Sequence, residues 1–371
     1  MQDKDIKSNH SIKNYPPHQG ESGKQQTIQK RIEWVDIIKG MAIFCVVFGH
    51  VEVYSEGNLG GFFYRLQSIF CMPLFFFLSG LFAKPQYDLK DSFLCIKKKF
   101  SQLMIPFLVC GSLYVYLIMP NKPWWILFVG GHAHCGFWFL LVLFEIFLLF
   151  TLCQIISRKF SKDLSGRSFF VMAIIIESIL AIVYILCLTG IVIQDPWYKA
   201  TSFVKLLYYF PFFIMGYFFM RNQEKLTLKF NNLVYTISSV IFVVLYVIYD
   251  KYHIHLLPFQ WILALLAMVS IISLFRSFEE HFSNNKKYIN IIESIGRNTL
   301  EIYVLHYFFI PRNMKYLKDI IIPNNLIDTN VVIELAINSS IACVTIAVTL
   351  CCAFLINKNL FLKKILFGKI S

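Results

Sequence analysis

Long apolar stretches separated by short polar segments make up most of the chain. Ten of these stretches each have about the length of an α-helix that crosses roughly 30 Å of hydrocarbon. They lie near residues 34–53, 62–83, 102–119, 137–157, 169–193, 203–220, 233–250, 256–276, 289–310 and 331–356. The pattern predicts an all-α polytopic membrane protein with about ten transmembrane helices.

Polar segments flank the apolar region. Residues 1–30 carry charges of both signs and no apolar core, so we interpret them as a disordered cytoplasmic tail and not as a signal peptide. We expect one transmembrane domain over residues 31–357, a second cytoplasmic tail over 358–371, and no attached soluble domain. Trp124 and Trp125 lie in a segment too short to span, which favours a position at the membrane interface.

The basic residues of the loops predict the orientation of the chain. Four loops (84–101, 158–168, 221–232, 276–290) hold 15 Lys or Arg, whereas the five alternate loops hold 6. Because cytoplasmic loops are enriched in Lys and Arg, both termini are predicted to lie in the cytoplasm.

Composition excludes several other classes of protein. The chain is 57% hydrophobic and 15% charged, a balance that soluble domains do not have. The net charge of +13 follows from cytoplasmic loops such as 97–99 and from the tails, so we expect no nucleic-acid partner. Nearly all of the ten cysteines fall in apolar spans, where they act as small hydrophobic residues, so no disulfide framework is expected.

Lys39 and His50 are the most informative pair of residues. They are eleven positions apart in the first span, which is about three helical turns, so both side chains lie on one face, about 16 Å apart. Ionisable groups within a membrane are costly without a partner or a wet cavity, and imidazole is well suited to accept a proton near neutral pH. Asp36, one turn before Lys39, is placed to pair with it.

The predicted topology brings further polar residues to the outer level of His50. Arg65 begins the second span there, and His306 lies near the outer end of the ninth span. His132 and His134 enter the fourth span on the same side; we expect them at the loop surface, and two histidines alone predict no metal site.

Carboxylates within the spans are a second set of candidates. Glu145 follows Trp138 by seven residues, so the two share a helical face. Glu177 and Glu301 also lie within predicted spans. Buried ionisable groups alone leave two classes open, an enzyme site and the proton relay of a transporter or flippase.

Four stretches of the chain, in order, resemble the membrane-bound acyltransferase-3 family. They are RIEWVDIIKGMAIFCVVFGHV, MPLFFFLSGLF, GFWFLLVLFEIFLLF and IGRNTLEIYVLHYFF, and together they extend from about residue 31 to 310. The first matches the family's basic residue, ten positions and essential histidine; the last matches its Tyr-x-x-His, here Tyr303 and His306. Two positions depart from the pattern, because Cys71 replaces a frequent histidine and Glu145 lies two residues beyond the usual glutamate position, here Leu143.

The resemblance implies an integral-membrane O-acyltransferase of the bacterial inner (plasma) membrane. Its donor would be a cytoplasmic acyl-CoA, most simply acetyl-CoA, with no bound cofactor, and its acceptor a hydroxyl of an extracytoplasmic glycan or lipid-linked sugar. His50 would act as general base or acyl carrier, Lys39 would bind a CoA phosphate, and Arg65 or His306 would stabilise the oxyanion or orient the acceptor.

Two alternatives stand beside this hypothesis. The first is a transporter or flippase in which His50, Glu145 and Glu177 form the relay. The second is a non-catalytic scaffold or sensor, a possibility raised by Cys71. The pattern leaves the oligomeric state open.

Overall fold

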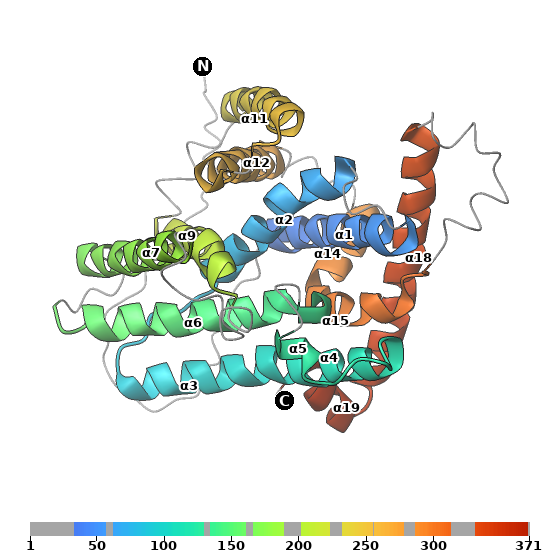
Figure 1. Ribbon diagram of the computed structural model, residues 1–371, viewed down its shortest axis with the longest axis horizontal. Coiled ribbons are helices and arrows are strands. Elements are labelled where there is room, and N and C mark those ends of the chain that lie inside the picture. Colours follow the sequence, from blue (N-terminus) through green and yellow to red (C-terminus); the bar gives the residue numbers. More distant parts are fainter. Residues whose placement is uncertain are drawn as a thin grey trace, which may run out of the picture. The chain divides into compact units, whose positions relative to one another are not determined.

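The fold consists of α-helices. The computed structural model describes residues 33–56, 62–129, 134–160, 166–188, 202–222, 232–254, 256–277, 286–312 and 331–369, and these ranges contain no β-strand. The all-α prediction is therefore confirmed, with the helices arranged as in Figure 1. Residues 1–30, predicted to be a disordered tail, lie outside the described ranges.

The helices are, in chain order, α1 (Glu33–Glu56), α2 (Phe62–Leu81), α3 (Leu89–Lys99), α4 (Ile105–Ile118), α5 (Ile126–Val129), α6 (Trp138–Ser157), α7 (Arg167–Leu188), α9 (Phe203–Arg221), α11 (Asn232–Tyr252), α12 (Leu257–Ser277), α14 (Lys286–Arg297), α15 (Thr299–Phe309), α18 (Val331–Asn357) and α19 (Leu360–Phe367). Phe100–Met104 is a π-helical segment that joins α3 to α4 without a break.

Nine helices of the described chain are long and apolar enough to cross a membrane, with α3 and α4 counted as one. The protein is thus a multi-pass membrane protein, as predicted. Of the apolar window in α1, 72% is buried inside the protein, compared with 11% in α11. Helix α1 is therefore central, and α11 leaves most of its surface to the lipid. The side of the membrane on which each terminus lies stays a prediction from the charges.

The expected span at 289–310 is two helices instead of one. Helix α14 ends at Arg297 and α15 begins at Thr299, because Asn298 between them has non-helical dihedral angles (φ −104°, ψ 24°). Its side-chain amide donates to the carbonyl of Ser294 at 2.7 Å, a local bond that competes with helix continuation. Neither half is long enough to cross a bilayer alone.

The expected loop at 84–101 is largely helix α3. Asp88 caps its N-terminus by accepting a hydrogen bond from the backbone amide of Asp91 at 2.6 Å, and three lysines occupy its last turn. Both features stabilise a helix, because the cap satisfies a free N–H group and cations complement the C-terminal dipole. The lysines at 97–99 thus belong to a helix and not to a loop.

Helix α1 runs parallel to α14–α15, and the two keep one register from Gly40 to Ser55. Gly40 lies against Gly296, His50 against His306, and Ser55 against Pro311, and each pair is 256 residues apart in sequence. Close approach depends on the glycines, because a Cβ at Gly40 would overlap the carbonyl of Ile292 and one at Gly296 that of Asp36. The parallel pair defines a common axis with the histidines between its two ends.

Candidate active site

A pair of hydrogen-bonded histidines lies between α1 and α15. His50 Nδ1 is 2.8 Å from His306 Nε2, and the two rings are nearly parallel, with an interplanar angle of 6°. His306 is fully buried and His50 is mostly so. The structure therefore brings together two of the three histidine groups that the sequence predicts at one level.

The hydrogen bonds of the pair determine where its protons lie. His306 Nδ1 is 2.9 Å from the carbonyl of Ile302, and a carbonyl only accepts, so Nδ1 carries the proton. In a neutral ring Nε2 of His306 is then an acceptor, and His50 Nδ1–H donates to it. The remaining nitrogen, Nε2 of His50, keeps its lone pair. The pair thus presents one basic nitrogen whose orientation is fixed by the other ring.

Two tyrosines of α15 connect this pair to the start of α6. The hydroxyls of Tyr303 and Tyr307 both donate to the carbonyl of Gly136, at 2.8 and 2.9 Å, and the Tyr307 hydroxyl lies 3.4 Å from His50 Nε2. The Tyr303 hydroxyl also accepts a hydrogen bond from the backbone amide of Phe139 at 3.3 Å. Because the single proton of Tyr307 is donated to Gly136, its oxygen is available to accept a hydrogen bond from Nε2–H of a protonated His50.

Gly136 belongs to a left-handed turn of three residues. His134, Cys135 and Gly136 have φ values of 43°, 53° and 95°, a conformation that costs non-glycine residues about 1–2 kcal/mol each. His134 stabilises the turn, since its ring nitrogens lie 3.0 Å from the carbonyl of Leu127 and from the hydroxyl of Ser202. A Cβ at Gly136 would lie 2.6 Å from the ring of Tyr307.

The prediction that His134 lies at the loop surface is wrong. The side chain is 1% exposed and has a structural partner at each nitrogen, which explains its burial. His132 lies outside the described residues. Within the ranges that the structure describes, no group of three or more His, Cys, Asp or Glu side chains is arranged to bind a metal ion.

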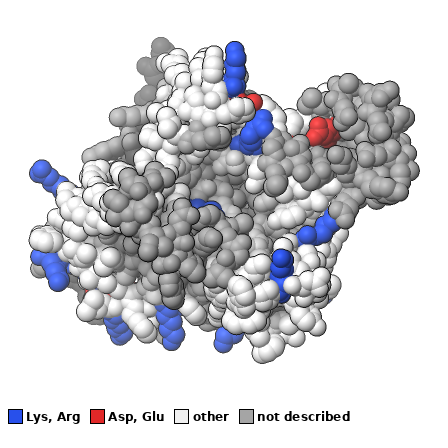
Figure 2. All heavy atoms as spheres, in the orientation of Figure 1, with Lys and Arg blue, Asp and Glu red and all other residues white. Residues whose placement is uncertain are grey.

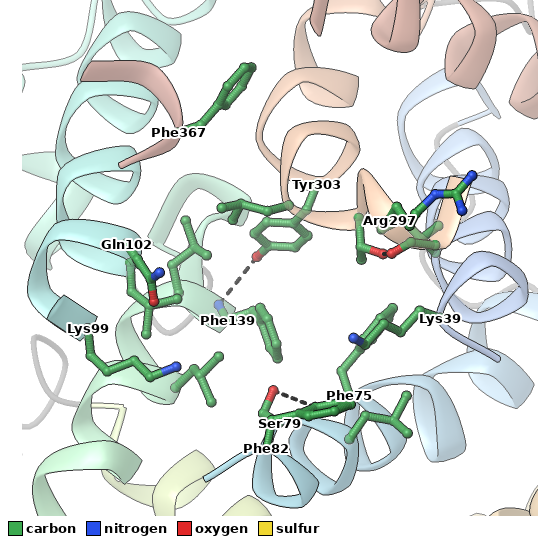
Figure 3. A pocket seen from close by; sticks show the side chains of 18 of the residues that line it. Lys39, Phe75, Ser79, Phe82, Lys99, Gln102, Phe139, Arg297, Tyr303 and Phe367 are labelled. Atoms are coloured by element: carbon green, nitrogen blue, oxygen red, sulfur yellow. Dashed lines mark hydrogen bonds between the residues drawn. The ribbon is translucent and has the colours of Figure 1, made fainter. Parts of the chain in front are cut away.

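A cavity of about 360 Å³ opens on the Lys39 side of the histidine pair. It lies near the lower end of the volumes typical of ligand pockets, roughly 300–1,000 Å³. Its walls are mostly apolar and aromatic, and Figure 3 shows Phe75, Phe82, Phe139 and Phe367 around it. Tyr303 also lines the cavity, and its ring is 6.0 Å from that of His306.

Four basic side chains line the same cavity, namely Lys39, Lys99, Arg297 and Lys369. Lys39 and Lys99 approach it from opposite walls, whereas the guanidinium of Arg297 points away from its centre (Figure 3). On the face drawn in Figure 2, Lys and Arg likewise predominate over Asp and Glu. An apolar cavity with cationic groups suits a ligand that has both an apolar and an anionic part.

Carboxylates or aromatic rings hold each of these cations. Lys39 lies 3.9 Å from Asp36, as the sequence predicts, and 4.9 Å from the centre of the Phe82 ring. Lys99 lies 4.1 Å from the centre of the Phe147 ring.

The other two cations pair with carboxylates of α14 and α15. Arg297 pairs with Glu293 at 3.7 Å, and Lys369 pairs with the buried Glu301. The four cations are thus positioned before any ligand arrives.

The remaining predicted site residues lie elsewhere. Arg65 forms an ion pair with Asp250 of α11, with 2.9 Å between Nε and Oδ1. Trp138 stacks on Tyr209, with ring centroids 5.5 Å apart, and the ammonium of Lys205 lies 4.5 Å from the centre of its ring. Lys205 also interacts electrostatically with Glu145.

Trp138 and Glu145 therefore do lie close to a common partner, Lys205. None of the hydrogen bonds or ring contacts of the histidine pair within the described chain involves Glu145 or Arg65.

Sequence reasoning missed several residues of this region. Tyr307 and Gly136 have no signal of their own, because a tyrosine in an apolar span and a glycine near a turn are common. The sequence pattern predicts a loop at Lys99 and a tail at Lys369. Lys205, an ionisable group at the start of an apolar span, was detectable by the criterion that selected Lys39.

Comparison with protein families decides the assignment. The model of a family described as an acyltransferase domain, acyltransferase 3, matches residues 32–358. The chain belongs to the acyltransferase-3 family. No curated protein and no solved structure matches the chain. The expected family is thus confirmed over nearly the whole described region of this membrane acyltransferase.

The family match makes the protein an acyltransferase enzyme and disfavours the transporter hypothesis. The matched range contains the histidine pair, the left-handed turn and three of the four cations of the cavity. The fourth, Lys369, lies beyond it. For the acyltransferase, the histidine pair and the adjoining cavity are together the candidate active site.

Proposed function

We propose that this acyltransferase moves an acyl group, most simply acetyl, from cytoplasmic acyl-CoA to a hydroxyl of an extracytoplasmic glycan or lipid-linked sugar. The membrane would be the bacterial inner membrane. The single observation that carries the proposal is the hydrogen bond between His50 and His306 next to a cavity lined by cations.

The cavity suits the donor. CoA combines an anionic nucleotide with a long, largely uncharged pantetheine arm, and the cavity combines Lys39 and Lys99 with apolar walls. Lys39 and His50 are about 16 Å apart along the helix, a distance that an extended pantetheine arm covers. With a phosphate at Lys39, the thioester would come to the level of His50 once the Tyr303 side chain yields.

His50 then acts as general base. Its Nε2 takes the proton of the acceptor hydroxyl while the hydroxyl oxygen bonds to the thioester carbonyl carbon. The C–S bond breaks, and the proton passes from His50 to the departing CoA thiolate. His306 acts as a positioning residue, because its Nε2 accepts the Nδ1–H of His50 and stabilises the imidazolium.

The decisive test is the variant His50→Ala in membranes supplied with labelled acetyl-CoA. Because general-base catalysis contributes typically 10²–10⁴-fold, we expect glycan acylation to fall at least 100-fold at normal expression. Ser79→Ala serves as a control, since Ser79 lines the cavity and only donates to the carbonyl of Phe75 in its own helix. Transfer by H50A close to the wild-type rate contradicts the proposal.

A second experiment separates the base from the acyl-carrier role. Purified protein is mixed with labelled acetyl-CoA in the absence of acceptor and quenched within one turnover. If His50 acts as a base, the protein stays unlabelled. If the wild type instead carries one labelled acetyl group per protein and H50A carries none, Nε2 of His50 is the acyl carrier.

A further inference from the structure

Arg312 occupies the end of the site opposite to the cationic cavity. It follows α15 by three residues, and Pro311 next to it accepts a hydrogen bond from Ser55 at the C-terminal end of α1, at 2.7 Å. Along the parallel α1–α15 axis the order is therefore Lys39, then the histidine pair, then Arg312. The cavity residues of both helices all precede the histidines.

Aromatic side chains connect Arg312 to the histidine pair. Its guanidinium carbon lies 5.3 Å from the ring centre of Tyr54 and 5.6 Å from that of Tyr114, and its Nη2 donates to the Tyr114 hydroxyl at 2.7 Å. The Tyr54 ring is 6.0 Å from the His50 ring. Only one aromatic side chain, that of Tyr54, thus lies between the guanidinium and the basic histidine.

Most of the other cations near the site have an acidic partner, whereas Arg312 has none among the described residues. Four of those cations are paired with a carboxylate, namely Lys39, Arg65, Arg297 and Lys369. For Arg312, no described carboxylate forms an ion pair, and the side chain is exposed.

The guanidinium is therefore positioned by aromatic contacts while its charge is not neutralised. A guanidinium has five N–H donors in a planar fork that matches a carboxylate or phosphate. Only one donor of Arg312 is used among the described residues.

We infer that Arg312 binds an anionic group, a carboxylate or a phosphate, of the acceptor close to the hydroxyl that is acylated. The inference rests on the proposed function, since it assumes that the acceptor reaches His50 from the end of α1 and α15. It narrows the acceptor to molecules with an acidic sugar or a sugar phosphate.

Equilibrium binding to the purified full-length protein tests this without requiring turnover. The probes are p-nitrophenyl glucuronide, its neutral counterpart p-nitrophenyl glucoside, and glucose 1-phosphate. We expect wild type to bind at least one anionic probe at least tenfold more tightly than the glucoside. Arg312→Gln should remove this preference and leave glucoside binding unchanged, and Arg312→Lys should retain part of it.

Lys251→Gln is the matched control, because Lys251 is an exposed cation 5.4 Å from the ring centre of Tyr252. Its removal should leave the preference intact. Tighter binding of the glucuronide points to an acidic sugar and tighter binding of glucose 1-phosphate to a sugar phosphate, and either supports the inference. Equal binding of all three probes by wild type, or a preference that persists in R312Q, overturns it.

The proposed function is judged separately on the same preparation. His50→Ala should abolish acyl transfer but keep the anion preference, because Arg312 does not contact His50. If the wild type consumes no acetyl-CoA with any of the probes, the result speaks against the proposed function. The binding measurement does not depend on turnover and is interpreted separately.

Discussion

Individual residues of the site differ in how far the sequence predicts them. His50 and His306 were predictable, because an imidazole within an apolar span is costly without a function. Their hydrogen bond was not, since no spacing rule relates residues 256 positions apart. The left-handed turn at Gly136 was also hidden, because its cause is tertiary: the carbonyl must accept from two tyrosines of α15.

His306 offers a test of the tautomer argument at the scale of one residue. We expect His306→Ala to lower kcat for acyl transfer about 10–100-fold, because His50 Nδ1–H loses its acceptor. His306→Gln should cost less than tenfold, since the glutamine amide oxygen can accept at the position of Nε2. Transfer to endogenous glycan from labelled acetyl-CoA measures both.

Which of the two variants has the higher kcat matters more than either kcat value. If H306Q is no more active than H306A, with both folded as judged by thermal unfolding in detergent, His306 does more than accept a hydrogen bond from His50.

At the scale of the element, apolar length predicted the helices well but not their interruptions. The segment 289–310 is apolar enough to suggest one span, yet Asn298 divides it. The polar segment before residue 100 suggests a loop, yet Asp88 caps a helix there. Both errors arise because hydropathy averaged over a window of residues is insensitive to a single side chain that caps or breaks a helix.

The parallel contact of α1 with α14 depends on Gly40, so a substitution of this glycine tests the packing of the two helices. Gly40→Ala places a methyl group against the backbone carbonyl of Ile292, which cannot move alone. We expect a loss of about 1–3 kcal/mol in the free energy of unfolding, the usual cost of overpacking. Activity should fall as well, because the same contact sets the register that brings His50 to His306.

Gly49→Ala is the matched control in the same helix. Its methyl group would meet the side-chain amide of Gln67 at 2.7 Å, the flexible end of a side chain. Both variants gain helix propensity, about 1 kcal/mol, so the difference between them isolates the contact. Equal thermal stabilities of G40A and G49A in detergent would contradict the role assigned to the α1–α14 contact.

For the whole molecule, the donor cavity is built from segments far apart in the chain. Lys39 comes from α1, Lys99 from α3, Arg297 from α14, and Phe367 and Lys369 from the residues at and after the end of α19. Sequence reasoning identified Lys39 only, because the others become neighbours through the packing of the helices. What was predicted as a C-terminal tail thus supplies one wall of the cavity.

The ion pair between Lys369 and Glu301 should hold this wall in place. The side chain of Glu301 is 1% exposed and that of Lys369 is 37% exposed, so removing the lysine leaves a buried carboxylate without its cation. We expect Lys369→Gln to cost about 2 kcal/mol of unfolding free energy, less than a fully buried pair because Lys369 is partly solvated. The double variant Lys369→Gln, Glu301→Gln should recover most of that loss.

Steady-state kinetics of the wild type, K369Q and the double variant separate an effect on stability from an effect on donor binding. Lys369 is one of four cations around the donor cavity, so both K369Q and the double variant should raise the KM for acetyl-CoA several-fold at little change in kcat. Recovery of stability without recovery of KM is the expected result. A KM that returns to wild type in the double variant would mean that Lys369 supports the cavity wall but does not attract the donor.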